Sequence, residues 1–256
     1  MYIEKHRLDG KTAFITGGGR GIGLCTAQGL AEAGARVIIS DHDPAILEVG
    51  RAAMAEVGHP VEAMALDVTR PANVKRAADE CNMKYGGVDI LVANAGIAWP
   101  DTGGEDMADE VWLKVIDVNL HGVFWCCRDF GRHMLARGHG SVVTVGSMSG
   151  LISNRPQRQA HYNAAKAGVH HLTRSLAGEW AARGVRVNAV APGYIDTAMS
   201  GTGLRTELGK QWLRDTPMQR GGRPDEVASV ILFLASDAAS LLTGSVIVAD
   251  AGYTVW

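Results

Sequence analysis

The sequence predicts an α/β fold, a doubly wound parallel sheet of about seven strands with helices on both faces. Two observations carry this prediction. Short runs rich in β-branched residues alternate with helix-length segments along all 256 residues, and these runs carry apolar residues on both faces. In addition, a glycine-rich turn joins the first such run to the first helical segment, as in nucleotide-binding α/β folds.

The expected elements follow one another regularly. The strand runs are 12–16, 36–40, 61–66, 89–96, 141–147, 185–193 and 245–252, and the helical segments are about 21–34, 43–57, 71–85, 106–137, 160–183 and 224–236. No internal repeat or low-complexity linker divides the chain, so we expect one domain over residues 1–256. The least regular segment, 200–224, is expected to be a lid with a short helix.

Composition narrows the classes of function. Hydrophobic residues make up 46% of the chain and charged residues 20%, with a formal net charge of −2. This balance is typical of globular proteins, and the absence of a basic tract argues against nucleic acid and anionic membranes as partners. No uninterrupted apolar run approaches the ~18 residues of a spanning helix, so we expect a cytoplasmic protein.

The turn "TGGGRGIGL" predicts a dinucleotide site. Glycines allow a sharp turn and a close approach of the ligand, while the helix N-terminus attracts a pyrophosphate. The G-x-G-x-x-G and Walker patterns do not fit, whereas T-G-x-x-x-G-x-G fits through Thr16, Gly17, Gly21 and Gly23. A merely tight turn is the alternative. The candidate cofactor residues here are Gly17, Arg20, Gly21, Ile22 and Gly23.

Asp41, at the end of the second strand run, favours NAD over NADP. A carboxylate there can accept hydrogen bonds from the adenosine ribose hydroxyls and repels a 2′-phosphate. Arg20 argues mildly for NADP, because a guanidinium in the loop could pair with that phosphate. We give Asp41 the greater weight, since a carboxylate facing a phosphate costs more than a distant guanidinium recovers.

Two further strand ends hold candidate cofactor residues. Asp67 and Val68 follow the third run and are expected near the adenine, although an aspartate there is often only a turn or helix cap. Asn94 and Gly96 end the fourth run in "ANAG", where a glycine lets the cofactor ribose approach the backbone.

The stretch "HYNAAKAG" suggests proton chemistry. Tyr162 and Lys166 are spaced i and i+4 on an expected helix and therefore share a face. An ammonium ~4 Å from a phenolate stabilises it by about 4 kcal/mol, enough to bring a tyrosine pKa of about 10 close to neutrality. Such a phenolate can accept the proton of an alcohol while hydride leaves its carbon for a nicotinamide. The alternative is a snorkelling lysine beside a half-buried aromatic ring.

Taken together, these motifs resemble the short-chain dehydrogenase/reductase family, with its Rossmann-type fold. The matching stretches are "TGGGRGIG", "ANAG", "DVNLHGVF", "GSMSG", "YNAAK" and "APGYIDT", in the family's order over nearly the whole chain. The resemblance implies an oxidoreductase without a metal, and Asn119, Ser147, Tyr162 and Lys166 as its catalytic residues. Asn119 would hold a water that relays protons from Lys166, with a helix kink as the alternative.

Two serines compete for the family's substrate-orienting role. Family members commonly place it thirteen residues before the tyrosine, which corresponds to Ser149, whereas the G-S-x-x-G pattern corresponds to Ser147. We choose Ser147, because it directly follows the strand and insertions collect in loops.

The resemblance also assigns the remaining contacts and the assembly. Pro192, Gly193, Ile195 and Thr197 would approach the nicotinamide, and similar chains form homotetramers through the long helices and the last strand. The substrate is expected to meet Ala98, Trp99, 149–159 and 194–215.

"GSMSGLISNRPQ" and the terminal "GYTVW" resemble NAD-dependent polyol dehydrogenases of the galactitol and sorbitol type. Asn154, Arg155, Gln157 and Gln159 would suit a polyol or diol. The alternatives are an NADPH-dependent 3-oxoacyl thioester reductase and a nucleotide-binding protein without catalysis.

Overall fold

The computed structural model describes residues 1–197 and 203–256 and contains the expected parallel sheet. Its seven strands lie in the order β3-β2-β1-β4-β5-β6-β7. Their bounds are β1 Thr12–Thr16, β2 Arg36–Asp41, β3 Glu62–Ala65, β4 Ile90–Ala93, β5 Gly140–Val145, β6 Val185–Pro192 and β7 Val246–Ala249. The order reverses between β1 and β4, and ligands of such sheets bind beyond the carboxyl ends at this crossover.

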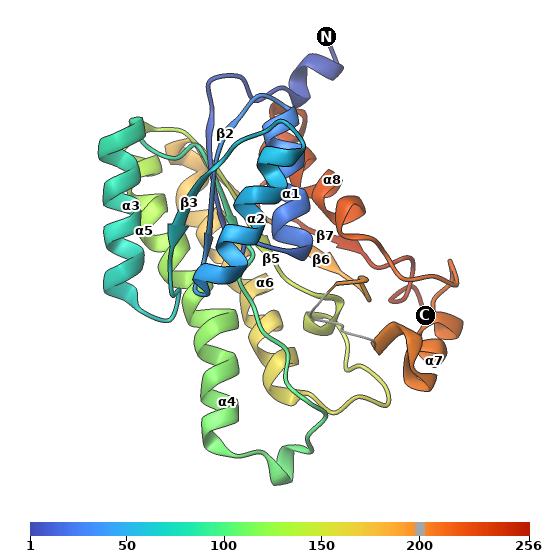
Figure 1. The fold of residues 1–256 in the computed structure, drawn as a ribbon. Helices are drawn as coiled ribbons and strands as arrows, with labels where there is room; N and C mark the ends of the chain where they lie inside the picture. Colours follow the sequence, from blue (N-terminus) through green and yellow to red (C-terminus); the bar gives the residue numbers. More distant parts are fainter. Residues whose placement is uncertain (198–202) are drawn as a thin grey trace.

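Helices cover both faces of the sheet (Figure 1). Their bounds are α1 Gly21–Glu32, α2 Pro44–Glu56, α3 Pro71–Tyr85, α4 Asp109–Ile116, α5 Gly122–Arg137, α6 Ala160–Trp180, α7 Glu207–Asp215 and α8 Pro224–Ala235. Prolines stand at the first position of α2, α3 and α8, where a helix needs no backbone N–H. Gly86 and Gly138 follow α3 and α5 with φ of 75° and 76°, the left-handed conformation that ends helices.

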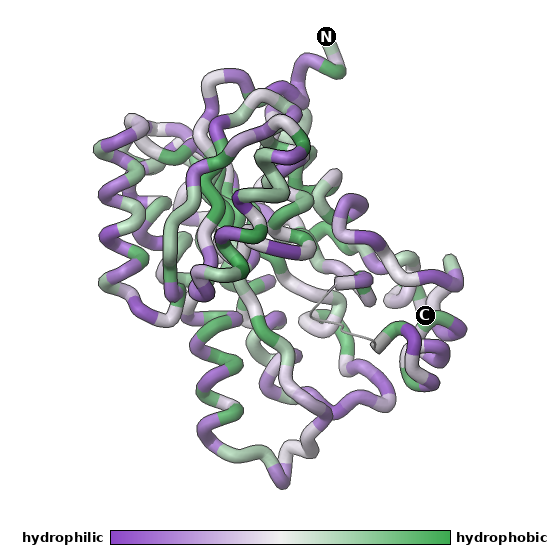
Figure 2. The backbone as a smooth tube through the Cα atoms, viewed as in Figure 1, coloured by the Kyte–Doolittle hydropathy of each residue, from purple (hydrophilic) through white to green (hydrophobic). Residues whose placement is uncertain are grey.

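Two hydrophobic cores lie on opposite faces of the sheet. Phe14 of β1 packs with α3, α5 and α6, and its ring centroid is 4.5 Å from that of Phe130. Its neighbours Ala13 and Ile15 point to the other side, which α1, α2 and α8 cover. Because successive strand residues face opposite sides, a strand buried on both faces is mostly apolar on both. Figure 2 shows the resulting concentration of hydrophobic residues in the central strands.

The expected helix over 106–137 is wrong in detail. Gly104–Asp106 forms a 3₁₀ turn, and α4 and α5 are joined by a π-helical segment, Asp117–His121. The Gly122 amide donates to the carbonyl oxygen of Asp117, five residues back, instead of four. This widened turn carries the buried Asn119.

Smaller differences concern the ends of elements. The fourth strand stops at Ala93 rather than at residue 96, and α6 ends at Trp180 before a 3₁₀ turn. The expected lid over 200–224 contains α7; its residues 200–202 lie outside the described residues, as do residues 198–202 of the expected 194–215 substrate segment. In Figure 1, α7 lies beside the C-terminal segment, and the Met218 amide donates to the Ala251 carbonyl there.

No helix within the described ranges 1–197 and 203–256 is long and apolar enough to cross a bilayer. The same ranges contain no group of three or more histidine, cysteine, aspartate or glutamate side chains able to hold a metal ion.

Candidate active site

The glycine loop connects β1 to α1 at the crossover of the sheet. Gly17 and Gly21 have φ of 62° and 55°, which side-chain-bearing residues rarely adopt. The helix cap, Arg20, is extended and exposed, and the α1 amides that follow it face outward from the helix N-terminus. Backbone amides at a helix N-terminus form a ready anion site, so the loop fits the pyrophosphate of a dinucleotide.

Close packing fixes the shape of this loop. A Cβ on Gly23 would lie 2.1 Å from the Gly17 carbonyl oxygen and 2.7 Å from Asn94 Nδ2. Asn94 Nδ2 donates to the carbonyl oxygens of Thr16 and Gly17 at 2.9 and 3.0 Å. The Thr16 hydroxyl accepts the Asn94 and Ala95 amides, both at 3.0 Å. Asn94 therefore ties the β4 exit to the glycine loop, a role beyond the expected proximity to a ribose.

The acidic residues at the ends of β2 and β3 differ in their partners. Asp41 is buried at the end of β2, and its Oδ1 accepts the Asp43 amide at 3.2 Å. Asp67 is half-buried and accepts the Thr69 amide and hydroxyl at 2.9 and 2.7 Å, as a residue preceding a helix often does. Val68 is buried against Gly122, where an added Cβ would lie 2.7 Å from its Cγ2.

Asn119 anchors the chain that leaves β4. Its Oδ1 accepts the Ile97 amide at 3.1 Å, and its Nδ2 donates to the Ile97 carbonyl at 2.9 Å. A Cβ on Gly96 would lie 2.7 Å from Asn119 Oδ1 and 3.6 Å from Lys166 Nζ. Gly96 thus lies between these two expected catalytic side chains, and the structure brings them together.

Ser147, rather than Ser149, contacts Tyr162. The Ser147 side chain hydrogen-bonds to the Tyr162 hydroxyl, an interaction that lowers the pKa of the tyrosine. Ser147 Oγ also accepts the Ser149 amide at 3.1 Å. Ser149 Oγ instead accepts from Gln159 Nε2 at 3.3 Å. The geometry therefore supports the choice of Ser147 as the serine next to the tyrosine.

The expected Tyr162–Lys166 arrangement needs a correction. Lys166 Nζ donates to the Val145 carbonyl oxygen at 2.8 Å and lies 5.6 Å from the Tyr162 ring centroid. Burial lowers the pKa of Lys166 to about 8. Burial also raises the pKa of Tyr162 above its ordinary value, and this outweighs the Ser147 hydrogen bond. Desolvation therefore raises the tyrosine pKa, and the ammonium, which binds a backbone carbonyl, does not offset this effect.

The segment after β6 reaches back to the glycine loop. Pro192 ends β6, the Gly193 amide donates to the Ala249 carbonyl, and Ile195 pairs with Gly222 in a short parallel bridge. A Cβ on Gly21 would lie 3.5 Å from Thr197 Cγ2. The residues expected near the nicotinamide thus border the residues expected near the pyrophosphate.

A polar network lies beyond the serines. Gln159 Nε2 donates to Asn154 Oδ1 and Asn163 Oδ1, both at 3.1 Å, and Asn154 Nδ2 donates to the Tyr194 hydroxyl at 3.3 Å. Tyr194 stacks on Trp212 of α7, with ring centroids 4.3 Å apart and planes 6° from parallel.

An ion pair joins two of the expected substrate loops. Arg158 Nε lies 2.7 Å from Asp101 Oδ1, and the Thr102 amide donates to the Arg158 carbonyl. These two contacts link the loop after β4 to the loop before α6.

Sequence reasoning missed several of these partners. Val145 and Ile97 contribute only backbone atoms, which carry no side-chain signal. His170 contacts the serine turn through its Nε2, which lies 3.4 Å from the Ser147 nitrogen. The i, i+4 spacing of Lys166 and His170 was the sequence feature that could have placed both side chains on the same face of the helix.

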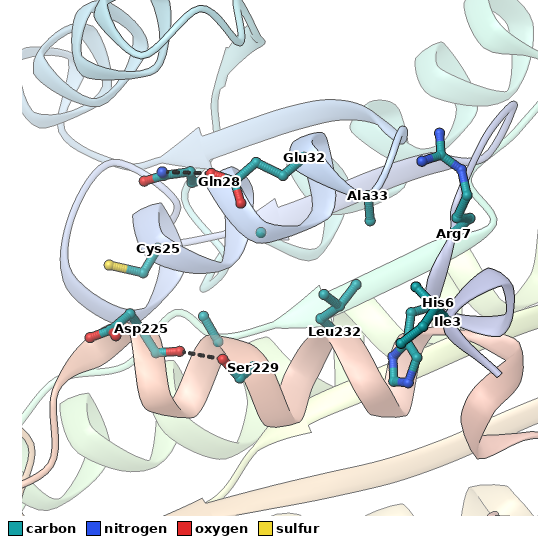
Figure 3. A pocket seen from close by; sticks show the side chains of 12 residues that line it. Ile3, His6, Arg7, Cys25, Gln28, Glu32, Ala33, Asp225, Ser229 and Leu232 are labelled. Atoms are coloured by element: carbon teal, nitrogen blue, oxygen red, sulfur yellow. Dashed lines mark hydrogen bonds between the residues drawn. The ribbon is translucent and has the colours of Figure 1, made fainter.

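A separate groove of about 420 Å³ lies between α1, α8 and the N-terminal 3₁₀ turn Ile3–His6. Figure 3 shows Cys25, Gln28 and Glu32 of α1 facing Asp225, Ser229 and Leu232 of α8 across it. None of the expected site residues lines this groove.

Fold and site define a class of protein. A glycine loop at the crossover of a doubly wound sheet, with a proton-handling cluster at the same edge, is the arrangement of nicotinamide-dependent oxidoreductases.

Comparison with known proteins shows the family. A family model described as enoyl-(acyl carrier protein) reductase matches residues 17–254. The chain is 51% identical, over 100% of its length and 99% of the relative, to galactitol 2-dehydrogenase of Rhizobium johnstonii. It therefore belongs to the short-chain dehydrogenase/reductase family.

Solved structures agree. The crystal structure of gox2181 superposes with a TM-score of 0.97 at 52% identity, and each chain is covered fully. A gluconate 5-dehydrogenase from Burkholderia cenocepacia, in complex with NADP and tartrate, gives a TM-score of 0.94 at 34% identity, again over 100% of both chains.

Proposed function

We propose that this protein is an NAD-dependent dehydrogenase that interconverts a polyol or diol and the corresponding ketone. The observation that carries the proposal is the Ser147–Tyr162 hydrogen bond beside a buried Lys166, at the edge of the sheet where the glycine loop lies. The galactitol relative supports a sugar alcohol as the substrate class.

Each residue of the site has a defined task in this proposal. The Ser147 hydroxyl and Tyr162 hold the substrate oxygen, and Tyr162 accepts its proton as the alcohol is oxidised. The oxidised nicotinamide of NAD supplies the hydride acceptor. Lys166 passes the proton onward, and Asn119 keeps Gly96 and Ile97 in place beside it.

The pKa values agree with this division of roles. Tyr162 in the free protein is protonated at neutral pH, because burial raises its pKa. A positively charged nicotinamide next to it would lower that pKa in the bound state. Tyr162 thus becomes a base only where a hydride acceptor is present.

NAD is the proposed cofactor because of Asp41. Its buried carboxylate, at the end of β2, would face the adenosine ribose and repel a 2′-phosphate. The gluconate 5-dehydrogenase complex contains NADP, so the cofactor must be measured rather than inferred from the family. The exposed Arg20 is the residue that could favour NADP.

A polyol substrate is favoured by the polar network beside Ser149. Ser149, Asn154, Gln159 and Asn163 place hydroxyl and amide groups next to the proposed catalytic serine. Several hydroxyl groups on a substrate could replace these internal hydrogen bonds, whereas an apolar acyl chain would leave them unpaired.

The assembly is also a proposal. We infer a homotetramer from the family resemblance, and a groove beside α5 and α6 offers a mixed surface for it, lined by Phe124, Leu135, Leu176 and Trp180 together with the charged Arg128, Arg132, Glu179 and Arg183. The edge strand β7 adds an exposed Val248. Light scattering of the purified protein measures the mass, and a monomer at micromolar concentration contradicts the proposal.

The test of function is a substrate panel with both cofactors. Purified protein is incubated with NAD or NADP and with galactitol, sorbitol, mannitol and short diols, and the reduced cofactor is followed by absorbance. We expect turnover of at least one polyol or diol with NAD and a lower kcat/KM with NADP. Turnover of a 3-oxoacyl thioester with NADPH but of no polyol would replace the proposal, and cofactor binding without any turnover would indicate a nucleotide-binding protein.

A further inference from the structure

We propose that His170 is a positioning residue that holds the Ser147 hydroxyl toward Tyr162. This inference rests on the proposed function, because it assigns a task within the same site. His170 stands one helical turn after Lys166 on α6 and is buried, with 2% of its surface exposed.

The imidazole lies directly against the turn that carries the serine. A Cβ on Gly146 would lie 2.2 Å from His170 Nε2, and a Cβ on Gly150 would lie 2.7 Å from His170 Cε1. The ring therefore touches both glycines that flank the stretch from Ser147 to Ser149. These glycines leave the space that the ring fills, so ring and turn determine each other's position.

A hydrogen bond also joins the imidazole to the serine turn. The Ser147 amide nitrogen lies 3.4 Å from His170 Nε2, a long hydrogen bond in which the amide donates. Burial, together with Lys166 and Arg174, lowers the pKa of His170 to about 4. The imidazole is therefore neutral at pH 7, and its Nε2 can accept while Nδ1 carries the proton.

Simple packing does not explain a histidine at this position. Among the described residues, His170 Nδ1 is buried without a hydrogen-bond partner. A buried donor without a partner destabilises a fold, and an aliphatic side chain of similar size would avoid this cost. What the aliphatic side chain could not supply is an acceptor for the Ser147 amide.

Two substitutions distinguish the role of His170 as a hydrogen-bond acceptor from its role in filling space. His170→Leu fills the space without an acceptor, whereas His170→Gln places its Oε1 near the position of Nε2. We expect His170→Leu to lower kcat by about 10- to 100-fold with little change in the Kd for NADH, and His170→Gln to stay within about threefold of the parent. The control is His171→Leu, which alters the exposed neighbouring histidine and should leave kcat unchanged.

A double-mutant cycle distinguishes positioning from a general structural effect. If His170 acts through Ser147, then His170→Leu has no further effect on the residual turnover of Ser147→Ala. An additional loss of tenfold or more in that background overturns the inference. Equal losses in His170→Leu and His170→Gln, or full activity in His170→Leu, also overturn it.

Crystal structures of His170→Leu and His170→Gln provide a readout that is independent of turnover. We expect the Ser147–Tyr162 hydrogen bond to be lost in His170→Leu and kept in His170→Gln, and an unchanged bond in His170→Leu contradicts the inference. If the parent turns over no alcohol or ketone, the proposed function fails, and these structures still decide the role of His170.

Discussion

Lys166 donates its hydrogen bond to the carbonyl oxygen of Val145, the last residue of β5, and not to Tyr162, four residues before it on α6. The two residues of the proposed proton-transfer pair therefore have separate partners, a strand carbonyl for the lysine and Ser147 for the tyrosine. Because neither side chain neutralises the cost of burying the other, burial lowers the pKa of Lys166 to about 8 and raises that of Tyr162.

This arrangement predicts different pH dependences for the two directions of the reaction. Oxidation needs a deprotonated Tyr162 beside the oxidised nicotinamide, so its kcat/KM should rise between pH 6 and 9. Ketone reduction needs the protonated phenol, which the raised pKa of Tyr162 maintains through this range, so its kcat/KM should stay nearly constant. Steady-state assays across this range in both directions measure the effect. Tyr162→Phe should abolish both, and parallel profiles in the two directions would contradict the assignment of Tyr162 as acid and base.

The two serines should differ sharply on substitution. Ser147→Ala removes the hydroxyl bonded to Tyr162, so kcat should fall by about 10²-fold or more. Ser149→Ala removes only the acceptor of a Gln159 bond, so the change should stay below about tenfold and appear mainly in KM. Kinetics of both variants with the best substrate decide which serine acts in catalysis. An inactive Ser149→Ala variant together with an active Ser147→Ala variant would assign the role to Ser149.

Substitution of Asp41 should change the preference between cofactors. In Asp41→Ser the repulsion of a 2′-phosphate is gone, so kcat/KM with NADP should rise by about tenfold or more while that with NAD falls. Asp43→Ser is the matched control, because it removes the neighbouring carboxylate and keeps a side chain that can cap α2. If Asp43→Ser changes the preference and Asp41→Ser does not, Asp41 does not face the ribose.

Two glycines of α1 predict opposite effects of the same substitution. Gly23→Ala forces a methyl group against the Gly17 carbonyl, so it should lower the free energy of unfolding by about 1–3 kcal/mol and abolish NADH binding. Around Gly29 there is no atom within 4 Å of an added Cβ, so Gly29→Ala should raise that free energy by up to about 1 kcal/mol. Urea unfolding and NADH fluorescence test both, and normal NADH binding by Gly23→Ala would refute the loop's role.

His170 predicts a dependence of stability on acid pH. Its folded-state pKa of about 4 lies below the ordinary 6.5, so the unfolded chain binds more protons between these values. Its contribution is complete above pH 6.5 and is lost as the pH falls through 4, up to about 3 kcal/mol. Urea unfolding at pH 7, 5.5 and 4.5 should therefore show a smaller loss for His170→Gln than for the parent. Parallel losses would show that His170 does not remain neutral in the folded protein.

The sequence predicts the features that depend on local chemistry. The strand runs match the observed strands within a few residues, because strands buried on both faces are rich in apolar residues. The glycine loop is equally visible, since positive φ at Gly17 and Gly21 requires glycine. The expected tyrosine, lysine, serine and asparagine do come together at one edge of the sheet.

Features that depend on hydrogen bonds to the backbone could not be predicted from the side chains. The Lys166 bond goes to a backbone carbonyl that every residue possesses, so the expected direction of the Tyr162 pKa was wrong. Counting residues could not choose between Ser147 and Ser149 either. That choice depends on how the turn from Gly146 to Gly150 folds over His170.

The π-helical turn before α5 has a consequence for how this chain tolerates change in length. One additional residue within Asp117–His121 sets α4 and α5 out of phase, so α4 contacts α6 while α5 packs on α3 and the sheet. Deleting one residue there would restore an ordinary helix and rotate α4 by about 100° about its axis. The loop that Asn119 holds would then face away from Lys166. The loss of a single residue would thus disrupt the proposed site while leaving the helix itself intact.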